Sequence, residues 1–404
     1  MRNTKHKLFY EKSLKYLHND LDICGIVRNH FIALSMRYFR RYGKGLSYAK
    51  MSAHLTKLKR LEKYKHWNIP YSWALQNVLK RLAESFKEMR TLGRGHPQFK
   101  SCKKHKGMTF RGEQIKLAYL LPKQKHERNH PTYEIRLNGR WYRFALHRNI
   151  EGKIIQVQVT RDALGDVYIT LTEECSEVKP EPKTGKAEGF DMGIKDFLTG
   201  SDGERYTSPM FYKQNADTLA KAQKSYSRKV KGSNNEERER KRIARIHKKT
   251  ANQRTDHHWK LAIDLCRKFD IMFFEDLNLR GMKALFGKQV SDLAFGEFIK
   301  KLQHQSRKRL KSVHKIGRWT ASTKSCSVCE HKNDSIPLSD RQWICPKCHT
   351  HLDRDHNAAI NILKEGVASF GLGDVRPIVL LGRIVGCSVE VSTSRLLKST
   401  NAFA

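Results

Sequence analysis

Two Cys-x-x-Cys pairs near the C-terminal end constrain this chain more tightly than any other feature of its sequence. Cys326 and Cys329 form the first pair, and Cys345 and Cys348 form the second, with fifteen residues between the pairs. Each pair lets two thiolates approach one ion, and two pairs complete a tetrahedron, which is the usual four-thiolate zinc site. Catalytic zinc is not expected, because four thiolates leave no open position. The sequence therefore predicts one structural zinc ion, with a rubredoxin-type iron centre as the chemical alternative.

The remaining cysteines and the start of the chain bear on the compartment. The total of nine cysteines is odd, the other five are scattered, and the N-terminus lacks an apolar signal segment. This pattern argues for a reducing compartment and against a disulfide framework. No stretch of about 18 apolar residues is present, so a membrane span is not expected. We expect a prokaryotic cytoplasmic protein that associates with the nucleoid.

The charge of the chain predicts its class of partner. Its 404 residues are enough for two or three domains, and 79 Lys and Arg against 40 acids give a net charge of +39. Such an excess is larger than solubility requires and predicts a polyanion bound with strongly salt-dependent affinity. Nucleic acid is the favoured polyanion. An anionic membrane surface is the alternative, but the sequence has no basic amphipathic helix with an exposed aromatic and leucine face.

Helical periodicity dominates residues 16–92 and is clearest from Ser72 to Met89, where apolar residues recur on one stripe. Gln76, Asn77 and Lys80 lie off that stripe. They form either a solvated face or a surface that faces nucleic acid, and the sequence alone does not decide between the two.

The rest of the chain alternates between strands and basic helices. Residues 133–146 and the hairpin at 154–171 predict a small antiparallel sheet or barrel, and the Pro- and Lys-rich segment 176–189 predicts a linker. A long basic helical region covers 217–268, broken at a Gly-Ser-Asn-Asn sequence, and a second basic helix is expected at 296–315.

Several carboxylates are candidates for a magnesium-dependent phosphodiesterase site, which needs acids from separate elements to meet around two ions. Asp191 lies in an apolar strand, and Glu275 or Asp276 ends a second one. Asp353 or Asp355 begins the last helix, and Asp353 is well placed to cap it, which would leave Asp355 in the first turn to reach the metals. Singly, each is as well explained as a turn acid, a strand-end charge or a helix cap. Strand alternation puts Glu275 and Asp276 on opposite faces, so only one can be a ligand, and spacing does not choose.

Four motifs together carry a family resemblance: GFDMGIKDFLT, HKKTANQRTDHHWKLA, FFEDLNLRGM and RQWICPKCHTHLDRDHNAAINIL. In this order they resemble the transposon-encoded TnpB (OrfB) proteins, compact RNA-guided nucleases related to type V CRISPR effectors. The resemblance covers about residues 70–365 and is strongest from 186. It implies that Asp191, Glu275 and Asp355 are the catalytic acids and that they hold two magnesium ions. In this family the zinc ribbon is inserted just before the last catalytic helix.

The resemblance also implies a multidomain α+β architecture. Its expected parts are a wedge-type β-barrel at 1–15 and 106–178, a helical recognition domain at 16–105, a linker at 179–188, a RuvC-like nuclease domain of the ribonuclease H type at 189–319 and 351–365, a zinc ribbon at 320–350 and an unassigned tail at 366–404.

The implied activity is cleavage of double-stranded DNA beside a short adjacent motif, directed by a guide RNA from the transposon end. Gln76, Asn77, Lys80 and Arg254 are the candidate nucleic-acid contacts. Two alternatives stand beside this hypothesis. One is a nuclease-inactive RNA-guided repressor, which would be expected to have lost catalytic acids that are all present here. The other is a zinc-bearing DNA-binding regulator of transposition, which would bind duplex without RNA.

Overall fold

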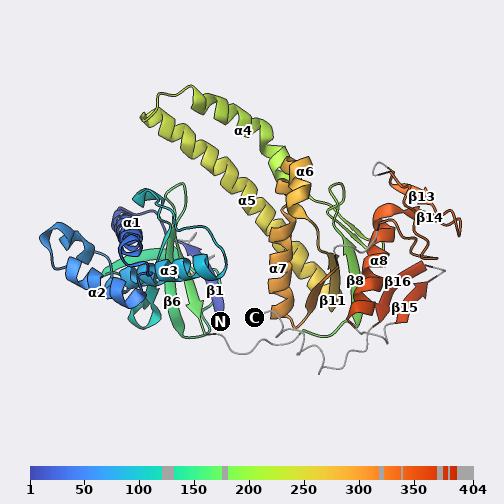
Figure 1. Cartoon of the computed structure of the whole chain (residues 1–404), viewed down its shortest axis with the longest axis horizontal. Helices are drawn as coiled ribbons and strands as arrows, with labels where there is room; N and C mark the ends of the chain where they lie inside the picture. Colours follow the sequence, from blue (N-terminus) through green and yellow to red (C-terminus); the bar gives the residue numbers. More distant parts are fainter. Residues whose placement is uncertain are drawn as a thin grey trace. The chain divides into compact units, whose positions relative to one another are not determined.

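The structure is a computed structural model of the chain, and its helices and strands form two compact units, Met1–Glu177 and Val178–Ala404 (Figure 1). Each unit combines helices with β-sheet, which agrees with the mixed class expected from the sequence. The expected tail falls largely outside the described residues, as does the first part of the expected linker. The structure describes residues 1–120, 132–174, 181–317, 323–337, 340–370, 376–380 and 383–388.

The first unit packs helices against antiparallel strands. Its α3 shows why these helices form: Leu75, Val78, Leu79 and Leu82 recur at helical spacing and are all buried. Its α-helices are α1 (Leu14–Tyr42), α2 (Tyr48–Leu58) and α3 (Ser72–Thr91), and its 3₁₀ segments are Glu62–Asn68, Cys102–Lys104 and Gly112–Gln114. Its strands are β1 (Arg2–Lys7), β2 (Gly107–Arg111), β3 (Lys116–Leu120), β4 (Thr132–Leu137), β5 (Arg140–Ala145), β6 (Ile154–Arg161) and β7 (Val167–Glu173).

The strands of the first unit form two antiparallel sheets. One has the order β1-β7-β6-β2 and the other β3-β4-β5. An isolated bridge between Leu8 and Phe144 links the two sheets, and both residues belong to the single core of this unit. The hairpin predicted at 154–171 is therefore present as β6 and β7.

The second unit is built on a mixed sheet. Its helices are α4 (Phe211–Ser227), α5 (Asn234–Lys268), α6 (Leu279–Leu293), α7 (Phe295–Lys308) and α8 (Arg354–Ser369). Its strands are β8 (Lys186–Asp191), β9 (Leu198–Gly200), β10 (Arg205–Tyr206), β11 (Ile271–Glu275), β12 (Ser312–Ile316), β13 (Gln342–Ile344), β14 (His351–Asp353), β15 (Arg376–Leu380) and β16 (Arg383–Ser388). The last residues of the expected linker thus belong to β8.

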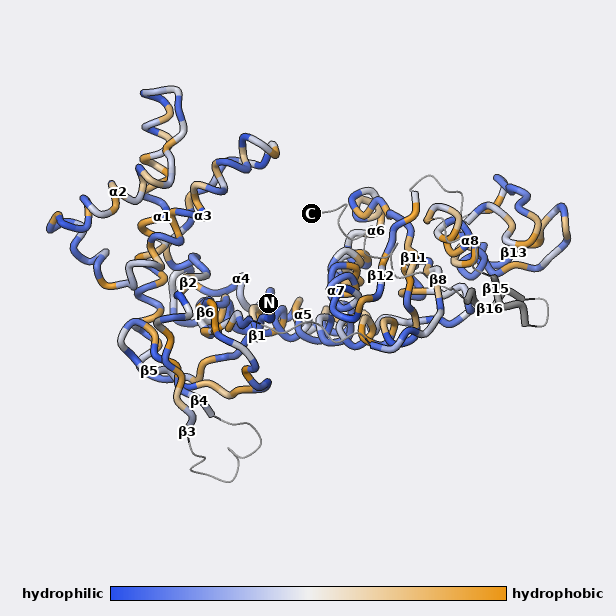
Figure 2. Tube along the Cα trace, turned by 90° about the horizontal axis from the view of Figure 1, so that it is seen from below, coloured by the Kyte–Doolittle hydropathy of each residue, from blue (hydrophilic) through white to orange (hydrophobic). Residues whose placement is uncertain are grey.

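The central sheet of this unit has the order β10-β9-β8-β11-β12, and β16 pairs with both β15 and β8. Strands β8, β11 and β12 are parallel neighbours. Strand β11 is predominantly apolar, whereas α5 is largely hydrophilic (Figure 2). Alternation along the strands makes two cores, one on each face of the sheet. Phe190, Met272 and Phe274 pack with α5 and α7 on one face, and Phe273 packs with α8 residues such as Leu363 on the other.

The helix predicted at 296–315 is wrong in its last part. Helix α7 ends at Lys308, and Ser312–Ile316 forms strand β12, paired in parallel with β11. Leu310 adopts a left-handed φ of 55°, which breaks the helix. The ammonium of Lys311 is buried against the carboxylate of Asp270, so the chain turns into the sheet at this point.

Within the described ranges, none of the helices combines the length and the apolar composition that a bilayer crossing requires.

Candidate functional site

Strands β8 and β11 place two of the candidate acids side by side. Their parallel pairing runs from Ile271 with Ala187 to Phe274 with Phe190, so Glu275 continues the register level with Asp191. Neighbouring strands lie about 4.8 Å apart, so the two acids leave the sheet as adjacent residues at the carboxyl ends of their strands. Both also share the sheet face that carries Phe273, because side chains alternate along a strand.

Helix α8 lies directly on this face because glycine lets the backbones approach. A Cβ at Gly189 would be 2.6 Å from the backbone nitrogen of Leu363, and a Cβ at Gly366 would overlap the ring of Phe273. Ala359 also lies against Gly189, and Asp355 precedes Ala359 by one helical turn. Asp191 follows Gly189 by two residues on the same strand face. The crossing therefore brings Asp355 over Asp191.

The start of α8 separates the roles of two neighbouring acids. Asp353 is the N-cap, and its Oδ1 accepts a hydrogen bond from the backbone N–H of His356 at 3.0 Å. Its Oδ2 accepts a hydrogen bond from Arg205 on β10 at 2.8 Å. Asp355 lies in the first turn and is buried. The division of roles expected from the sequence, with Asp353 as the cap and Asp355 turned inward, is the one the structure has.

The three acids influence one another electrostatically. Burial, followed by the negative charges of Asp355 and Glu275, raises the pKa of Asp191 to about 7. Burial also raises the pKa of Glu275, with a second contribution from Asp276. Asp276 itself turns away and accepts a hydrogen bond from Lys315 Nζ at 2.8 Å. The burial and mutual proximity of the acids therefore both oppose the ionised form of Asp191.

Two arginines at this site were missed by reasoning from the sequence. Arg341 Nη1 donates hydrogen bonds to both carboxylate oxygens of Asp355, at 3.1 and 2.8 Å, and Arg354 Nε lies 3.7 Å from Asp355 Oδ1. Arg341 comes from the cysteine-bearing segment and reaches the site because β13 pairs with β14 immediately before α8. Its backbone oxygen accepts a hydrogen bond from Arg354 N at 2.8 Å. The strand pairing explains this contact, since Arg341 and Asp355 are 14 positions apart in the sequence.

Among the residues that the structure describes, the four cysteines are the only group whose ligand atoms all lie within 4.8 Å of one another. The three acids do not meet this criterion. Two magnesium ions in a nuclease lie about 4 Å apart and are shared between ligands on either side, so their ligand set is wider than a single-ion site. The three acids therefore do not form a compact single-ion site of the kind that the cysteines form.

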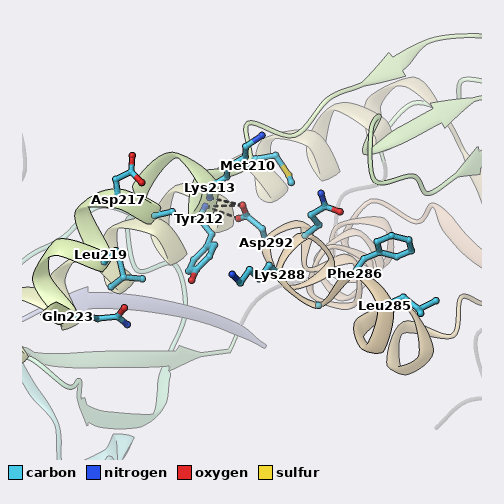
Figure 3. A pocket seen from close by; sticks show the side chains of 14 residues that line it. Met210, Tyr212, Lys213, Asp217, Leu219, Gln223, Leu285, Phe286, Lys288 and Asp292 are labelled. Carbon is cyan, nitrogen blue, oxygen red and sulfur yellow. Dashed lines mark hydrogen bonds between the residues drawn. The ribbon is translucent and has the colours of Figure 1, made fainter. Parts of the chain in front are cut away.

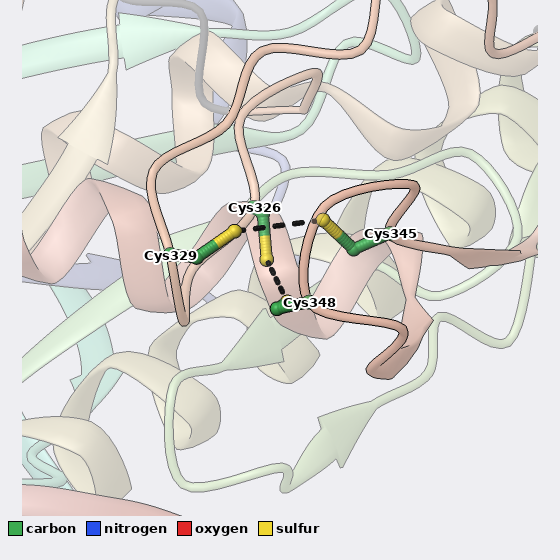
Figure 4. A group of neighbouring side chains, drawn as sticks. All are labelled: Cys326, Cys329, Cys345 and Cys348. Atoms are coloured by element: carbon green, nitrogen blue, oxygen red, sulfur yellow. Dashed lines mark hydrogen bonds between the residues drawn. The ribbon is translucent and has the colours of Figure 1, made fainter.

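The cysteine cluster has the geometry of a tetrahedral thiolate site (Figure 4). Cys326 Sγ lies 3.7 Å from Cys348 Sγ, and Cys329 Sγ lies 3.5 Å from Cys345 Sγ. Four sulfurs at about 2.3 Å from a central zinc would be about 3.8 Å apart, so the spacing fits the ion. Hydrogen bonds from the hydroxyl and the backbone N–H of Thr350 lower the pKa of the Cys348 thiol, which favours its thiolate form.

The two Cys-x-x-Cys turns repeat one backbone pattern. The N–H of Glu330 donates to the carbonyl of Cys326 at 2.9 Å, and the N–H of His349 donates to that of Cys345 at 2.8 Å. Glu330 and His349 both adopt a left-handed conformation, with φ of 62° and 55°. Both turns are therefore closed in the same way, and each points its two sulfurs inward.

A network of hydrogen bonds ties the first cysteine turn to α8. The buried side chain of Asn357 accepts a hydrogen bond from Ser327 N and donates one to Ser325 O, both at 2.8 Å. Asn361 donates to the same Ser325 oxygen at 2.7 Å, and Lys364 Nζ donates to Ser327 O at 2.6 Å. The cysteine turn is thus held against the helix that carries Asp355.

The expected nucleic-acid contacts on α3 lie on one side of that helix. Lys80 is exposed, whereas Gln76 and Asn77 are half-buried. The hydroxyl of Tyr48, at the start of α2, donates a hydrogen bond to Gln76 Oε1 at 3.3 Å. These side chains belong to the first unit.

Arg254 is in the second unit, on α5, and has protein partners. Its Nη1 donates to the carbonyl of Ser291 at 3.2 Å, and its Nη2 lies 3.7 Å from a carboxylate oxygen of Glu297. Arg254 therefore connects α5 to the ends of α6 and α7, and a contact with nucleic acid would use a side chain that is already engaged.

A cavity of about 710 Å³ lies between α4 and α6, away from the acids (Figure 3). The carboxylate of Asp292 closes one end by accepting hydrogen bonds from the backbone N–H groups of Tyr212 and Lys213, at the start of α4. Phe286 and Leu285, beside a break in α6, are exposed at its rim. Asp191, Glu275 and Asp355 do not line this cavity, so the cavity is not part of the carboxylate site.

Sequence comparison places two stretches of the chain in described families. Residues 155–285 match the sequence model of OrfB_IS605, described as "Probable transposase". Residues 295–362 match the TNB domain described as Cas12f1-like.

Two relatives match most of the chain. A Streptomyces pristinaespiralis protein named "Putative RNA-guided DNA endonuclease" is 33% identical over 358 residues, which is 85% of each chain. The Escherichia coli K12 protein named "Putative RNA-guided DNA endonuclease InsQ" is 24% identical over 369 residues, covering 87% of this chain and 89% of its own.

Two solved structures share the fold at low sequence identity. The protein in a Cas12f1–sgRNA–target DNA complex aligns with a TM-score of 0.55 and 14% identity, over 88% of this chain and 83% of its own. The mini-RNA-guided endonuclease CRISPR-Cas_phi3 aligns with a TM-score of 0.53 and 9% identity, over 91% of this chain and 92% of its own.

Proposed function

Because this chain belongs to the TnpB (OrfB) family, we propose that it is an RNA-guided endonuclease that cleaves double-stranded DNA beside a short transposon-associated motif. The observation that carries the proposal is the meeting of Asp191, Glu275 and Asp355 from two strands and a helix. Phosphodiester hydrolysis with two metal ions needs such an arrangement, in which acids far apart in the sequence face one space.

Magnesium fits the donors at this site. All three side chains offer carboxylate oxygens, the ligand type that magnesium prefers, and the charges of Asp355 and Glu275 help to raise the pKa of Asp191, as expected where acids crowd together. When bound, two magnesium ions would activate a water and neutralise the leaving oxygen.

The chain's own residues would divide the remaining work. Asp191 and Glu275 sit on rigid neighbouring strands, which fixes their spacing, and Asp355 closes the site from α8. Arg341 brings a positive charge to the same place and favours the approach of a phosphodiester. The zinc-bearing segment has a positioning role, because it supplies Arg341 and holds α8 through Asn357.

The domain assignment is part of the same proposal. The central sheet with α5, α7 and α8 suits a RuvC-like nuclease domain at 189–319 and 351–365, interrupted by a zinc ribbon at 320–350. The two linked antiparallel sheets suit a wedge-type barrel at 1–15 and 106–178, and α1 to α3 suit a recognition domain at 16–105.

The proposed partners are a guide RNA from the transposon end and a double-stranded DNA target. The net charge of +39 supports two polyanionic partners, and both long relatives carry names that specify RNA-guided DNA cleavage. In this proposal Gln76, Asn77 and Lys80 contact the adjacent motif, and Arg254 contacts the strands near the nuclease domain.

The test is cleavage of a plasmid bearing the target by the full-length protein with its guide RNA and magnesium. Asp191→Ala and Glu275→Ala should each abolish cutting while leaving RNA binding intact. Asp276→Ala is the matched control, since Asp276 adjoins Glu275 but pairs with Lys315. Cutting that survives Asp191→Ala would refute the site. A wild-type protein that binds RNA and target but never cuts would instead favour the repressor, and duplex binding without RNA would favour the regulator.

A further inference from the structure

We propose that a cavity in the first unit binds one unstacked nucleobase of a nucleic acid strand, an inference that rests on the nucleic-acid binding in the proposed function. The cavity has a volume of about 230 Å³ and lies where the C-terminal ends of α1 and α3 meet the connection after α1. Its walls and rim are formed chiefly by Met36, Phe39, Phe86 and Met89, with Arg40 and Arg90.

The size and walls of the cavity suit a flat aromatic group. A cavity of about 150 Å³ holds a benzene ring, so 230 Å³ accommodates a one-ring or two-ring base. Phe86 meets His96 edge to face, with ring centroids 5.3 Å apart, so the wall is already organised. Phe39 is 57% exposed although it lines an apolar cavity. A phenylalanine in that position has a free face on which a base can stack.

The rim carries positive charge that protein carboxylates do not neutralise. Within the described part of the chain, neither Arg40 nor Arg90 forms an ion pair with an acid. Segments 35–46 and 84–96, which frame the cavity, contain seven Lys and Arg against two Glu. One of these glutamates, Glu88, already pairs with Arg94. The last turns of α1 and α3 favour cations, but helix ends alone do not require arginines at the mouth of an apolar cavity.

The guanidinium of Arg90 lies close to a glycine of the connection after α1. A Cβ at Gly45 would be 2.5 Å from Arg90 Nη1, so the guanidinium lies against the bare backbone of the connection after α1. That connection begins at Gly43, whose φ of 62° ends α1 and whose N–H donates to Phe39 O at 2.8 Å. A phosphate flanking the inserted base would therefore meet Arg90 and Arg40 at the rim. Aromatic stacking beside unopposed arginines is how proteins hold single strands.

The strand can come from RNA or from DNA, and binding measurements distinguish the two sources. Full-length protein is titrated with a labelled 20-residue oligouridine RNA and a labelled oligothymidine DNA of the same length, followed by fluorescence anisotropy. Phe39→Ala should weaken binding of the strand that uses the cavity by about 5- to 100-fold. Phe39→Trp should keep that affinity, because it keeps the stacking surface. The matched control is Phe99→Ala, which removes a ring that is 54% exposed and lies outside the cavity.

A second measurement locates the base without any variant. Ultraviolet crosslinking of the protein with the same oligomers, followed by mass spectrometry, should give nucleotide adducts on peptides that contain Phe39, Phe86 or His96. Arg40→Gln should also reduce the slope of log affinity against log salt by about 0.7 for one lost phosphate contact. Equal affinities for Phe39→Ala and Phe99→Ala, or adducts confined to other peptides, would overturn the proposal.

Failure of this inference and failure of the nuclease assignment give different results. If only the cavity is misassigned, the wild-type protein cuts plasmid, cutting depends on Asp191, and Phe39→Ala binds both oligomers normally. If only the nuclease assignment is wrong, no cutting is seen, while the Phe39 effect and the adducts persist.

Discussion

Arg341 and Asp355 form a two-hydrogen-bond ion pair that joins the cysteine-bearing segment to the carboxylate cluster. Both bonds leave a single guanidinium nitrogen, at 3.1 and 2.8 Å from the two carboxylate oxygens. The side chain of Asp355 is 11% exposed and that of Arg341 is 43% exposed, so the pair sits at the mouth of the site. In the metal-free protein, Arg341 provides part of the positive charge that the acids need.

Removing this charge should destabilise the metal-free protein. Arg341→Gln leaves Asp355 beside Asp191 with less compensation, and we expect a loss of about 1 kcal/mol in the free energy of unfolding, small because the arginine is partly exposed. Magnesium should recover part of the loss. Urea titrations with and without magnesium measure both effects, with Arg280→Gln, an exposed arginine on α6, as the control. An equal loss in both variants would contradict the interpretation.

The contact between α8 and β8 should not tolerate a methyl group. Gly189→Ala would push a Cβ into the backbone of α8 at Leu363. We expect a cost of about 1–3 kcal/mol in unfolding free energy and a displacement of Asp355 that lowers cleavage. Gly287→Ala is the control, because no atom lies within 4 Å of a Cβ at that position. A Gly189→Ala protein with wild-type stability would show that α8 sits further from the sheet.

Asn357 should couple the cysteine turn to cleavage. Asn357→Ala leaves the buried N–H of Ser327 without its acceptor, at a cost of about 1–3 kcal/mol. Asn361→Ala should cost less, because Ser325 O keeps its bond from Asn357. Cleavage rates and zinc content, measured on both variants, should rank them in this order. The opposite ranking would exclude the coupling.

Loss of one thiolate should remove the zinc. In Cys345→Ser, metal content measured by plasma mass spectrometry should fall below one zinc per chain. The melting temperature should fall with it, because metal binding contributes directly to folding. Cys102→Ser, in the first unit and outside the cluster, should retain one zinc per chain. A full complement of zinc in Cys345→Ser would show that the ligand set is different.

Burial of Asp20 should lower the free energy of unfolding of the first unit by an amount that depends on pH. Burial raises the pKa of this carboxyl to about 6, although Asn138 Nδ2 donates to it at 2.9 Å. The folded state then holds its proton at pH values where the unfolded chain has released it, so stability falls as pH rises from about 4 to about 6. The loss reaches roughly 3 kcal/mol and is constant above that range.

Asp20→Asn removes the titrating group and should remove this component. Urea titrations of the full-length chain between pH 4 and pH 7 would measure the difference from wild type, which should grow through that window. Exposed Glu84→Gln is the control. A difference that does not change with pH would contradict the assignment.

Features that depend on residues close together in the sequence could be predicted from it. Alternation predicted that Glu275 and Asp276 face opposite sides, and the structure turns Asp276 to Lys315. The cap preference predicted the role of Asp353. In both cases neighbouring residues along the chain contain the information.

Contacts between secondary-structure elements could not be predicted from the sequence. Arg341 reaches Asp355 through the pairing of β13 with β14, and short strands of three residues give almost no periodic signal. Residues 312–316 form a strand because β11 offers a partner, although their basic neighbours predicted a continued helix. The role of Gly189 depends on the packing of α8 against β8, which the sequence does not show.

The shared register of β8 and β11 has an evolutionary consequence. A one-residue slip between these strands would place Phe274 or Asp276, and not Glu275, beside Asp191. Because side chains alternate, the residue at that position would then face the wrong side of the sheet. No intermediate arrangement exists in which the acids are merely a little misaligned. Insertions and deletions inside either strand should therefore act as all-or-none events, and gradual tuning of the chemistry is left to the surrounding loops and helices.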